Sequence, residues 1–154
     1  MSPSVSVILP NYNGSHLLEE NLPYLLESLD SINNEVIVVD DCSSDDSVDM
    51  LHRDYPEIKI VTSKSNEGFS ATCNKGIRTA SKKLLCIVNT DVRFTPDYFN
   101  NAVKHFVNDN LFAIKGDIIN YRGDISNITN TETAPVLYYK GGFLRFNHGI
   151  QPDG

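Results

Sequence analysis

Three apolar runs along the chain each end abruptly in small polar or acidic residues. The runs are Val5–Leu9, Val36–Val39 and Leu84–Val88, and the residues after them read Pro-Asn-Tyr-Asn, Asp-Asp-Cys-Ser-Ser and Asn-Thr-Asp. A parallel strand that is buried on both faces is typically a continuous apolar run, and open α/β sheets bind ligands at the carboxyl ends of their strands. The pattern therefore predicts a binding site where these three strands end.

Helical spacing follows the first run. Leucines recur at the spacing of one helical face, at Leu18, Leu22, Leu25 and Leu29. A proline inside a helix removes a backbone hydrogen bond, so Pro23 predicts that the regular helix starts near Asn21 rather than at Ser15. After the second run, Ser44 is expected to cap a helix that ends near Asp54, with two carboxylates close to its positive end.

Strands and helices continue to alternate as far as residue 121. The expected elements are a strand at Ile58–Thr62, a helix through Ala71, Asn74, Ile77 and Ala80, a helix starting at Thr95-Pro96-Asp97 with Phe99, Val103 and Phe106 on its buried face, and a strand at Phe112–Tyr121 interrupted near Gly116. This alternation predicts an α/β fold, a mainly parallel sheet flanked by helices. Residues 122–154 are expected to add a polar loop and a hairpin, Val136–Lys140 with Phe143–Phe146, to the same domain.

The composition is that of a globular protein with a negative charge. Of 154 residues 40% are hydrophobic, and the formal net charge is −7. Duplex binding depends on phosphate neutralisation by Lys and Arg, so nucleic acid is excluded as the main partner. An anionic ligand would need a local positive charge, from a metal ion or a helix N-terminus. The sequence has no membrane-length apolar run and no signal peptide, so we expect a cytoplasmic protein.

Several familiar motifs are missing from the sequence. It contains no Gly-rich dinucleotide fingerprint, no phosphate loop ending in Gly-Lys-Ser/Thr, no HExxH and no GxSxG. The commonest hydride-transfer, phosphoryl-transfer and serine-hydrolase functions are therefore disfavoured. Cys42, Cys73 and Cys86 form no CxxC pair and are expected to be reduced thiols in or near the core. The strand-end residues remain as candidates for chemistry.

Asp40 and Asp41 follow the second strand. Side chains alternate in direction along a strand, so these two should point to opposite sides and only one should face a ligand. A carboxylate in this place can accept hydrogen bonds from ribose hydroxyls or from the N–H of a pyrimidine base. For one of the two, a turn residue that binds nearby backbone amides is an equal alternative.

Asn89 and Asp91 follow the third strand two residues apart, so the same alternation would place them on one face. Mg²⁺ and Mn²⁺ prefer oxygen ligands, and Mg²⁺ commonly uses one or two carboxylates while phosphates and waters complete its shell. Asp91 is the candidate anionic ligand and Asn89 a weaker neutral one, although Asn-Thr-Asp alone is more typical of a solvated turn. In the first loop, Tyr12 could stack on a nucleotide base.

Taken together and in this order, the motifs resemble the inverting GT-A glycosyltransferases called family 2. The resemblance rests on Ser6–Asn13 as the opening strand and loop, on Val38–Asp45 as a "VDDGS.D" segment with Cys42 where Gly is usual, on Asn66-Glu67-Gly68 with Ser70, Ala71 and Asn74 as a helix start, and on Val88–Asp91 in the place of an Asp-x-Asp motif. It covers roughly Val5 to Phe99. It implies a Rossmann-like nucleotide-diphospho-sugar transferase fold with residues 1–121 as the nucleotide-sugar-binding part.

Carried over residue by residue, the resemblance implies that Pro10 and Tyr12 border the nucleotide base and that Asp41 hydrogen-bonds it. Asp91 would ligate a divalent metal, Mg²⁺ or Mn²⁺, on the donor pyrophosphate. The near neighbours of the nucleotide would be Asp40, Asn66, Gly68, Asn89 and Thr90. The implied partners are a UDP- or dTDP-sugar donor, a saccharide or lipid-linked acceptor, and the remainder of a full-length chain.

Two departures from the family pattern matter. Asn89 stands where an acid is usual, so the site carries less negative charge. This Asn-x-Asp variant is similar to that of family members that transfer rhamnose. An inverting transfer also needs a general base, which the family carries in a downstream acidic motif. The acids after Tyr121 are Asp124, Glu132 and Asp153, and none lies in a Glu-Asp pattern.

We therefore expect a fragment that holds the donor site and lacks the base, from a full-length protein that is cytoplasmic or peripheral to a membrane. Two alternatives stay open. One is a non-catalytic nucleotide-binding module in which the strand ends are vestigial. The other is a nucleotidyltransferase, which is disfavoured because its Gly-rich first loop is represented here by Gly14 alone.

Overall fold

The computed structural model describes residues 4–107, 111–116, 136–140 and 143–147. The chain divides into two compact units, Met1–Ile114 and Lys115–Gly154. Among the described residues, the first unit carries a four-stranded sheet with its helices and the second carries a two-stranded sheet.

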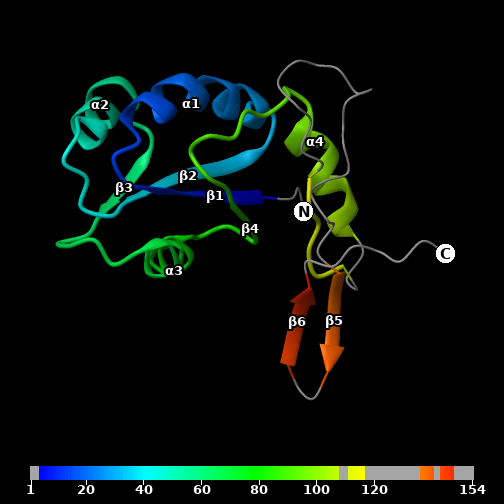
Figure 1. The fold of residues 1–154 in the computed structure, drawn as a ribbon. Coiled ribbons are helices and arrows are strands. Elements are labelled where there is room, and N and C mark those ends of the chain that lie inside the picture. Colours follow the sequence, from blue (N-terminus) through cyan, green and yellow to red (C-terminus); the bar gives the residue numbers. More distant parts are fainter. Residues whose placement is uncertain (1–3, 108–110, 117–135, 141–142, 148–154) are drawn as a thin grey trace, which may run out of the picture. The chain divides into compact units, whose positions relative to one another are not determined.

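A parallel sheet forms the centre of the first unit (Figure 1). Its strands lie in the order β3 (Lys59–Thr62), β2 (Asn33–Asp40), β1 (Ser4–Asn11) and β4 (Leu84–Ile87). β1 pairs with β2 up to Asn11↔Asp40 and with β4 up to Ile8↔Ile87. The three apolar runs are thus parallel strands, as predicted, and they are neighbours in the sheet, so that their carboxyl ends meet.

Helices cover both faces of this sheet (Figure 1). α1 (Ser15–Leu29) and α2 (Ser47–Asp54) lie on one face, and α3 (Phe69–Thr79) lies on the other. Strand residues are divided by alternation: those facing α1 and α2 include Val5, Val7, Leu9, Val36 and Val38, whereas those facing α3 are Ile8, Ile37 and Val39. All of them are 5% exposed or less, which explains why the strands read as continuous apolar runs. The predicted α/β fold is confirmed.

The start of α1 differs from the prediction, because the helix begins at Ser15 and continues through Pro23. A proline in a helix leaves the carbonyl four residues earlier without its donor. Here Pro23 and Glu19 are both exposed, so water can satisfy that carbonyl. The four predicted leucines of the opposite face are each 1% exposed. Burying them outweighs the proline, at roughly 1.5–3 kcal/mol for each side chain.

Two further helix predictions need correction. α2 begins at Ser47 with Asp46 as its N-cap residue, because the Ser44 hydroxyl donates to Asn13 instead of capping the helix. α4 (Tyr98–Ala102) passes into a 3-10 helix (Val103–Val107). Phe99 and Val103 are buried as expected, but Phe106 is only partly buried.

α3 packs tightly on β1 and β2 through its glycine. A Cβ on Gly76 would lie 2.3 Å from Ile8 Cγ2 and 3.2 Å from Val39 Cγ2. The α3 side of β4 is less covered, since Leu85 is 47% and Ile87 46% exposed. In the described part of the chain β4 is an edge strand of the sheet, with these two apolar side chains on the same side as Ile8.

The C-terminal elements are predicted in part. β5 (Val136–Lys140) and β6 (Phe143–Asn147) form the expected antiparallel hairpin. Residues 111–116 contain no strand, so the first half of the predicted strand at Phe112–Tyr121 is wrong, and its second half lies outside the described residues. Within the described ranges, no helix is long and apolar enough to cross a membrane.

Candidate functional site

A buried polar cluster joins the carboxyl ends of β1 and β2. Asn11 is 1% exposed, and its amide donates to Asp40 Oδ1 at 2.8 Å and to Ser43 Oγ at 3.3 Å. Asp40 is 2% exposed and also accepts hydrogen bonds from the Ser43 N–H at 3.0 Å and from the Ser43 hydroxyl. Buried polar groups cost free energy unless they are hydrogen-bonded, so this cluster fixes the loop after β2 against β1.

Further hydrogen bonds join the loops after β1 and β2 at the surface. The Asn13 N–H donates to Ser43 Oγ at 2.8 Å, and Asn13 Oδ1 accepts from the Ser44 N–H at 2.7 Å. The Asp45 carboxylate accepts from the N–H of Ser15 at 2.9 Å and of Ser47 at 3.1 Å. These are the first residues of α1 and α2, so one carboxylate serves the positive ends of both helices.

Asp41 lies on the other side of the sheet from Asp40, as the alternation predicts. Its carboxylate accepts from the Gly68 N–H at 2.7 Å and from the Glu67 N–H at 3.0 Å. Burial raises its pKa, but these bonds and those of the Ser63 and Thr72 hydroxyls outweigh burial, and the pKa lies below its ordinary value. Asp41 therefore stays ionised and holds the turn that starts α3, where Gly68 has a φ of 84°.

The third strand end is arranged differently from the prediction. β4 ends at Ile87, and Asn89 to Asp91 lie beyond it in a segment that turns at Thr90 and Asp91. Strand alternation therefore does not apply to Asn89 and Asp91, and it cannot place them on one face. Both residues are exposed. Their side chains are accessible to a ligand.

The first and third loops contact each other at Gly14. A Cβ on Gly14 would lie 2.5 Å from Asn11 Oδ1 and 3.5 Å from Thr90 Oγ1. A side chain at position 14 would therefore force the Asn11 side chain to shift. Asn11 Oδ1 is buried and has no hydrogen-bond partner among the described residues. The three predicted strand ends thus converge, and Gly14 of the first loop lies beside Thr90 of the third.

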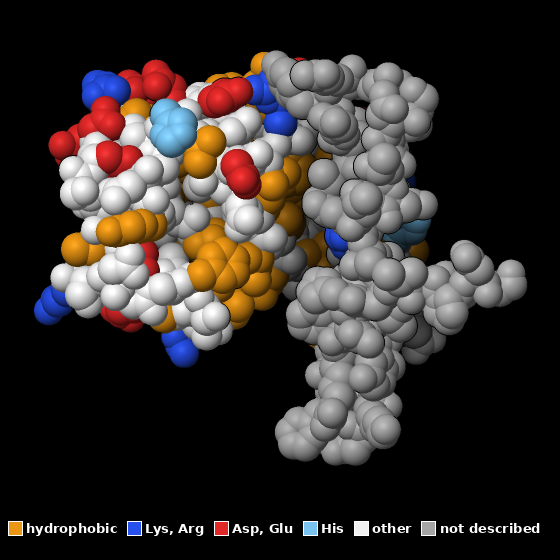
Figure 2. All heavy atoms as spheres, viewed as in Figure 1, with side chains coloured by type: hydrophobic (Ala, Val, Ile, Leu, Met, Phe, Trp, Pro, Cys, Tyr) orange, Lys and Arg blue, Asp and Glu red, His pale blue; other side chains and the backbone are white. Residues whose placement is uncertain are grey.

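The remaining candidates lie at the surface around this edge. Tyr12 is 56% exposed, Asn66 is exposed, and Pro10 and Gly68 are partly buried. Figure 2 shows acidic side chains gathered over α1 and α2 on the face that it presents. An anionic ligand here would need a cation to offset this charge.

The comparisons with known proteins agree with this geometry. The sequence model of the family described as Glycosyl transferase family 2 matches residues 6–152. The chain belongs to glycosyl transferase family 2. The dolichol-phosphate mannosyltransferase of Pyrococcus furiosus is 29% identical over 113 residues, which are 71% of this chain and 32% of that protein. The poly-beta-1,6-N-acetyl-D-glucosamine synthase of Staphylococcus epidermidis is 26% identical over 86% of this chain and 33% of its own length.

Solved structures show the same fold. The mannosyltransferase PcManGT from Pyrobaculum calidifontis, in complex with GDP-Man and Mn²⁺, is 29% identical with a TM-score of 0.63, covering 70% of this chain and 33% of that one. S. aureus TarS 1–349 in complex with UDP is 25% identical with a TM-score of 0.62, covering 68% of this chain and 32% of that one. The family 2 chain described here spans about a third of the length of the curated relatives it matches.

The donor set of this family 2 chain fits a metal that the nucleotide helps to hold. Among the described residues there is no group of three or more His, Cys, Asp or Glu side chains that could hold a metal ion. Mg²⁺ is usually held by one or two carboxylates together with substrate phosphates and waters. Asp91, exposed beside the polar loops, can supply that carboxylate, and Asn89 can supply a neutral oxygen.

Sequence reasoning missed the residues that position this site. Asn11, Asn13 and Ser43 were visible only as polar residues after a strand, and their mutual bonds depend on loop conformations. Asn21 had a signal, since it is a polar residue beside the apolar face of α1, and it is 8% exposed.

The cysteines are free, but Cys42 is exposed, so the expectation of a thiol in or near the core is wrong there. Burial raises the pKa of the Cys86 thiol to about 11.

Proposed function

We propose that this chain forms the donor-binding part of a metal-assisted glycosyltransferase that transfers a sugar, with inversion, from a nucleoside diphosphate to a saccharide or lipid-linked acceptor. The observation that carries the proposal is the convergence at one sheet edge of an ordered polar network after β1 and β2 and an exposed carboxylate after β4. The likeness to PcManGT, whose structure holds GDP-Man and Mn²⁺, supports a donor of this class. The donors we propose to test first are UDP- and dTDP-sugars.

The first two strand ends would bind the nucleoside. Tyr12 presents an exposed ring on which a base can stack, beside Pro10. The Asp41 carboxylate already accepts hydrogen bonds from the Glu67 and Gly68 N–H groups. In the proposal it would therefore both hold this turn and use its remaining acceptor positions to bind the base. Asp40 is buried against Asn11, and its part would be to fix the loop that carries Tyr12.

The third strand end would meet the pyrophosphate. Asp91 would hold the divalent cation, with Asn89 and Thr90 next to it and Asn66 and Gly68 as further neighbours of the nucleotide. When bound, such a cation offsets the charge of the diphosphate and stabilises it as a leaving group. This chain has a net charge of −7 and needs that compensation for an anionic donor.

Complete transfer also requires a group that takes the proton of the acceptor hydroxyl. We assign no residue of this chain to that step. The relatives are about three times longer than the matched segment, so we propose that the base and the acceptor site come from further chain. Residues 1–121 would then hold the donor, and residues 122–154 would belong to the same domain.

Calorimetric titration tests the proposal. UDP, dTDP and GDP are titrated into the protein with and without Mn²⁺, and we expect at least one of them to bind more tightly with the metal. Asp91→Ala should remove the metal enhancement. Asp30→Ala is the matched control, because Asp30 is an exposed acid that follows the last residue of α1, away from the strand ends. Absence of binding by all three nucleotides would overturn the proposal.

A further inference from the structure

Helix α1 holds the segment that carries Asp91 through a buried amide. Asn21 is 8% exposed, and its Nδ2 donates to the Leu17 carbonyl at 3.0 Å and to the Thr90 carbonyl at 3.1 Å. Both hydrogens of the amide are therefore used. The bond to Leu17 fixes the orientation of the side chain, so the second hydrogen is aimed at the peptide between Thr90 and Asp91.

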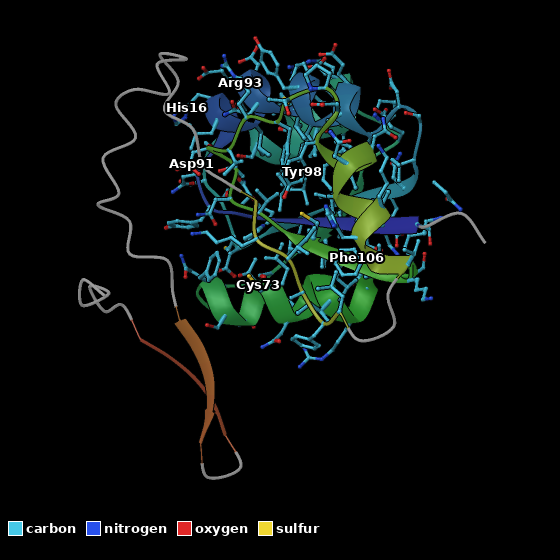
Figure 3. The ribbon with its side chains drawn as sticks, turned by 90° about the vertical axis from the view of Figure 1, so that its right-hand side faces the viewer. His16, Cys73, Asp91, Arg93, Tyr98 and Phe106 are labelled. Carbon is cyan, nitrogen blue, oxygen red and sulfur yellow. The ribbon has the colours of Figure 1, made fainter. Side chains whose placement is uncertain are left out.

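A second attachment lies on the other side of Asp91. The Arg93 guanidinium is 2.7 Å from Glu20 Oε1 and 4.2 Å from the centre of the Tyr24 ring. Glu20 and Tyr24 are four residues apart and lie on the same side of α1, next to Asn21. Figure 3 shows Asp91 and Arg93 on the same side of the molecule, with Arg93 beside α1. The helix thus holds the chain immediately before Asp91 and two residues after it.

We propose that Asn21 is a positioning residue for metal binding by Asp91, a role that rests on the proposed donor site. Asp91 is exposed and lies beyond the end of β4, so the sheet itself does not order it. A side chain that must first be ordered before it can coordinate a metal ion binds the ion more weakly, because the lost conformational freedom opposes binding. Asn21 removes that cost in advance by fixing the Thr90 carbonyl, while Glu20 and Tyr24 restrain Arg93.

The structure offers a matched control for this role. Asn34 also donates its amide to two backbone carbonyls, of Leu29 at 3.1 Å and Ile32 at 2.9 Å. It is the second residue of β2 and therefore lies at the amino ends of the strands, away from the carboxyl ends that form the proposed site. Replacing either asparagine by leucine removes two hydrogen bonds of the same kind, but only Asn21→Leu releases the Asp91 segment.

The test measures Mn²⁺ affinity in the presence of the nucleotide that binds the wild-type protein, with free Mn²⁺ read from its electron paramagnetic resonance spectrum. Nucleotide affinity without metal is measured in parallel, below the unfolding temperature of each variant. We expect Asn21→Leu to weaken Mn²⁺ binding by about tenfold or more. Its metal-free nucleotide affinity, and both affinities of Asn34→Leu, should stay within about twofold of wild type.

A double variant guards against failure of Asn21→Leu to fold. Glu20→Gln with Tyr24→Leu changes side chains that are 59% and 38% exposed, and it should weaken Mn²⁺ binding roughly two- to fivefold. Equal losses in Asn21→Leu and Asn34→Leu, or wild-type Mn²⁺ affinity in Asn21→Leu, would overturn the positioning role alone. A wild-type protein whose nucleotide binding ignores Mn²⁺ would overturn the proposed metal function itself.

Discussion

Gly68 donates its N–H to Asp41 Oδ2 at 2.7 Å, and through this bond an acid at the end of β2 fixes the start of α3. The Glu67 N–H points to the same carboxylate at 3.0 Å. Asp41 and Gly68 lie 27 positions apart in the sequence. Asp41, for which the family resemblance implies contact with a nucleotide base, therefore also organises the turn beside the proposed site, and the two roles can be separated by mutation.

Asp41→Asn should destabilise the protein by about 1–3 kcal/mol, because it removes a buried charged acceptor from two backbone donors. Urea denaturation measures this change. The Glu67 and Gly68 amides should also exchange with solvent faster than in wild type. Asp54→Asn, at an exposed acid paired with Arg53, serves as the control and should change stability by less than about 1 kcal/mol. Equal effects of the two variants would show that Asp41 does not hold this turn.

Glu35 should make the protein sensitive to acid. Burial raises its pKa, but hydrogen bonds from Ser6 and Ser81 outweigh burial and lower the pKa from 4.5 to about 2. A lowered pKa in the folded state gives stability that is complete above 4.5 and is lost as the pH falls towards 2. In Glu35→Gln the loss of stability across this window should be smaller. Denaturant unfolding at several pH values measures how steeply the free energy of unfolding falls with pH in the wild type and in Glu35→Gln. The exposed Glu57→Gln serves as the control.

The strands could be predicted because burial on both faces of the sheet requires apolar residues at consecutive positions. Val7, Ile8, Ile37 and Val38 are fully buried between two layers of helices, so each strand is apolar at consecutive positions. Helix limits were harder, because they depend on a competition between local and tertiary effects. Pro23 opposes the helix locally, and the buried leucines outweigh it.

The convergence of the candidate residues was predicted, but the hydrogen bonds that join them were not. Polar residues after three neighbouring strands must converge, whatever the loops do. The partners of Asp40 and Asp41 depend on loop conformations such as the φ of 65° at Cys42 and of 84° at Gly68. Those dihedral angles leave little trace in one sequence, apart from the glycine itself.

Cys42→Gly should stabilise the protein by roughly 0.5–1 kcal/mol. A left-handed backbone costs a non-glycine residue about 1–2 kcal/mol, and the greater flexibility of glycine when unfolded offsets part of that gain. Asn13 is the internal comparison, with a φ of 51°. Its side chain accepts the Ser44 N–H at 2.7 Å, so Asn13→Gly should bring no gain. Thermal unfolding distinguishes the two variants, and a destabilised Cys42→Gly protein would contradict the argument.

Gly76→Ala should destabilise the protein by about 1–3 kcal/mol through overpacking. The added methyl group would meet Ile8 Cγ2, whose side chain is fully buried under α3 and cannot swing away. Chemical denaturation measures the loss. Ser70→Ala, at an exposed position of the same helix, controls for the general effect of an alanine in α3. A Gly76→Ala protein as stable as this control would mean that α3 can move away from the sheet at no cost.

Tyr12→Ala should weaken nucleotide binding by roughly 1–3 kcal/mol, the usual contribution of an aromatic ring stacked on a base. Stacking uses the face of the ring and not its hydroxyl, so Tyr12→Phe should bind nearly as tightly as wild type. Because Tyr12 is 56% exposed, neither change should alter the unfolding midpoint greatly. Calorimetry with the nucleotide alone and with Mn²⁺ should give the same relative loss in both titrations, since the proposal assigns the base to Tyr12 and the cation to Asp91. A loss that appears only with Mn²⁺ would place Tyr12 at the pyrophosphate rather than at the base.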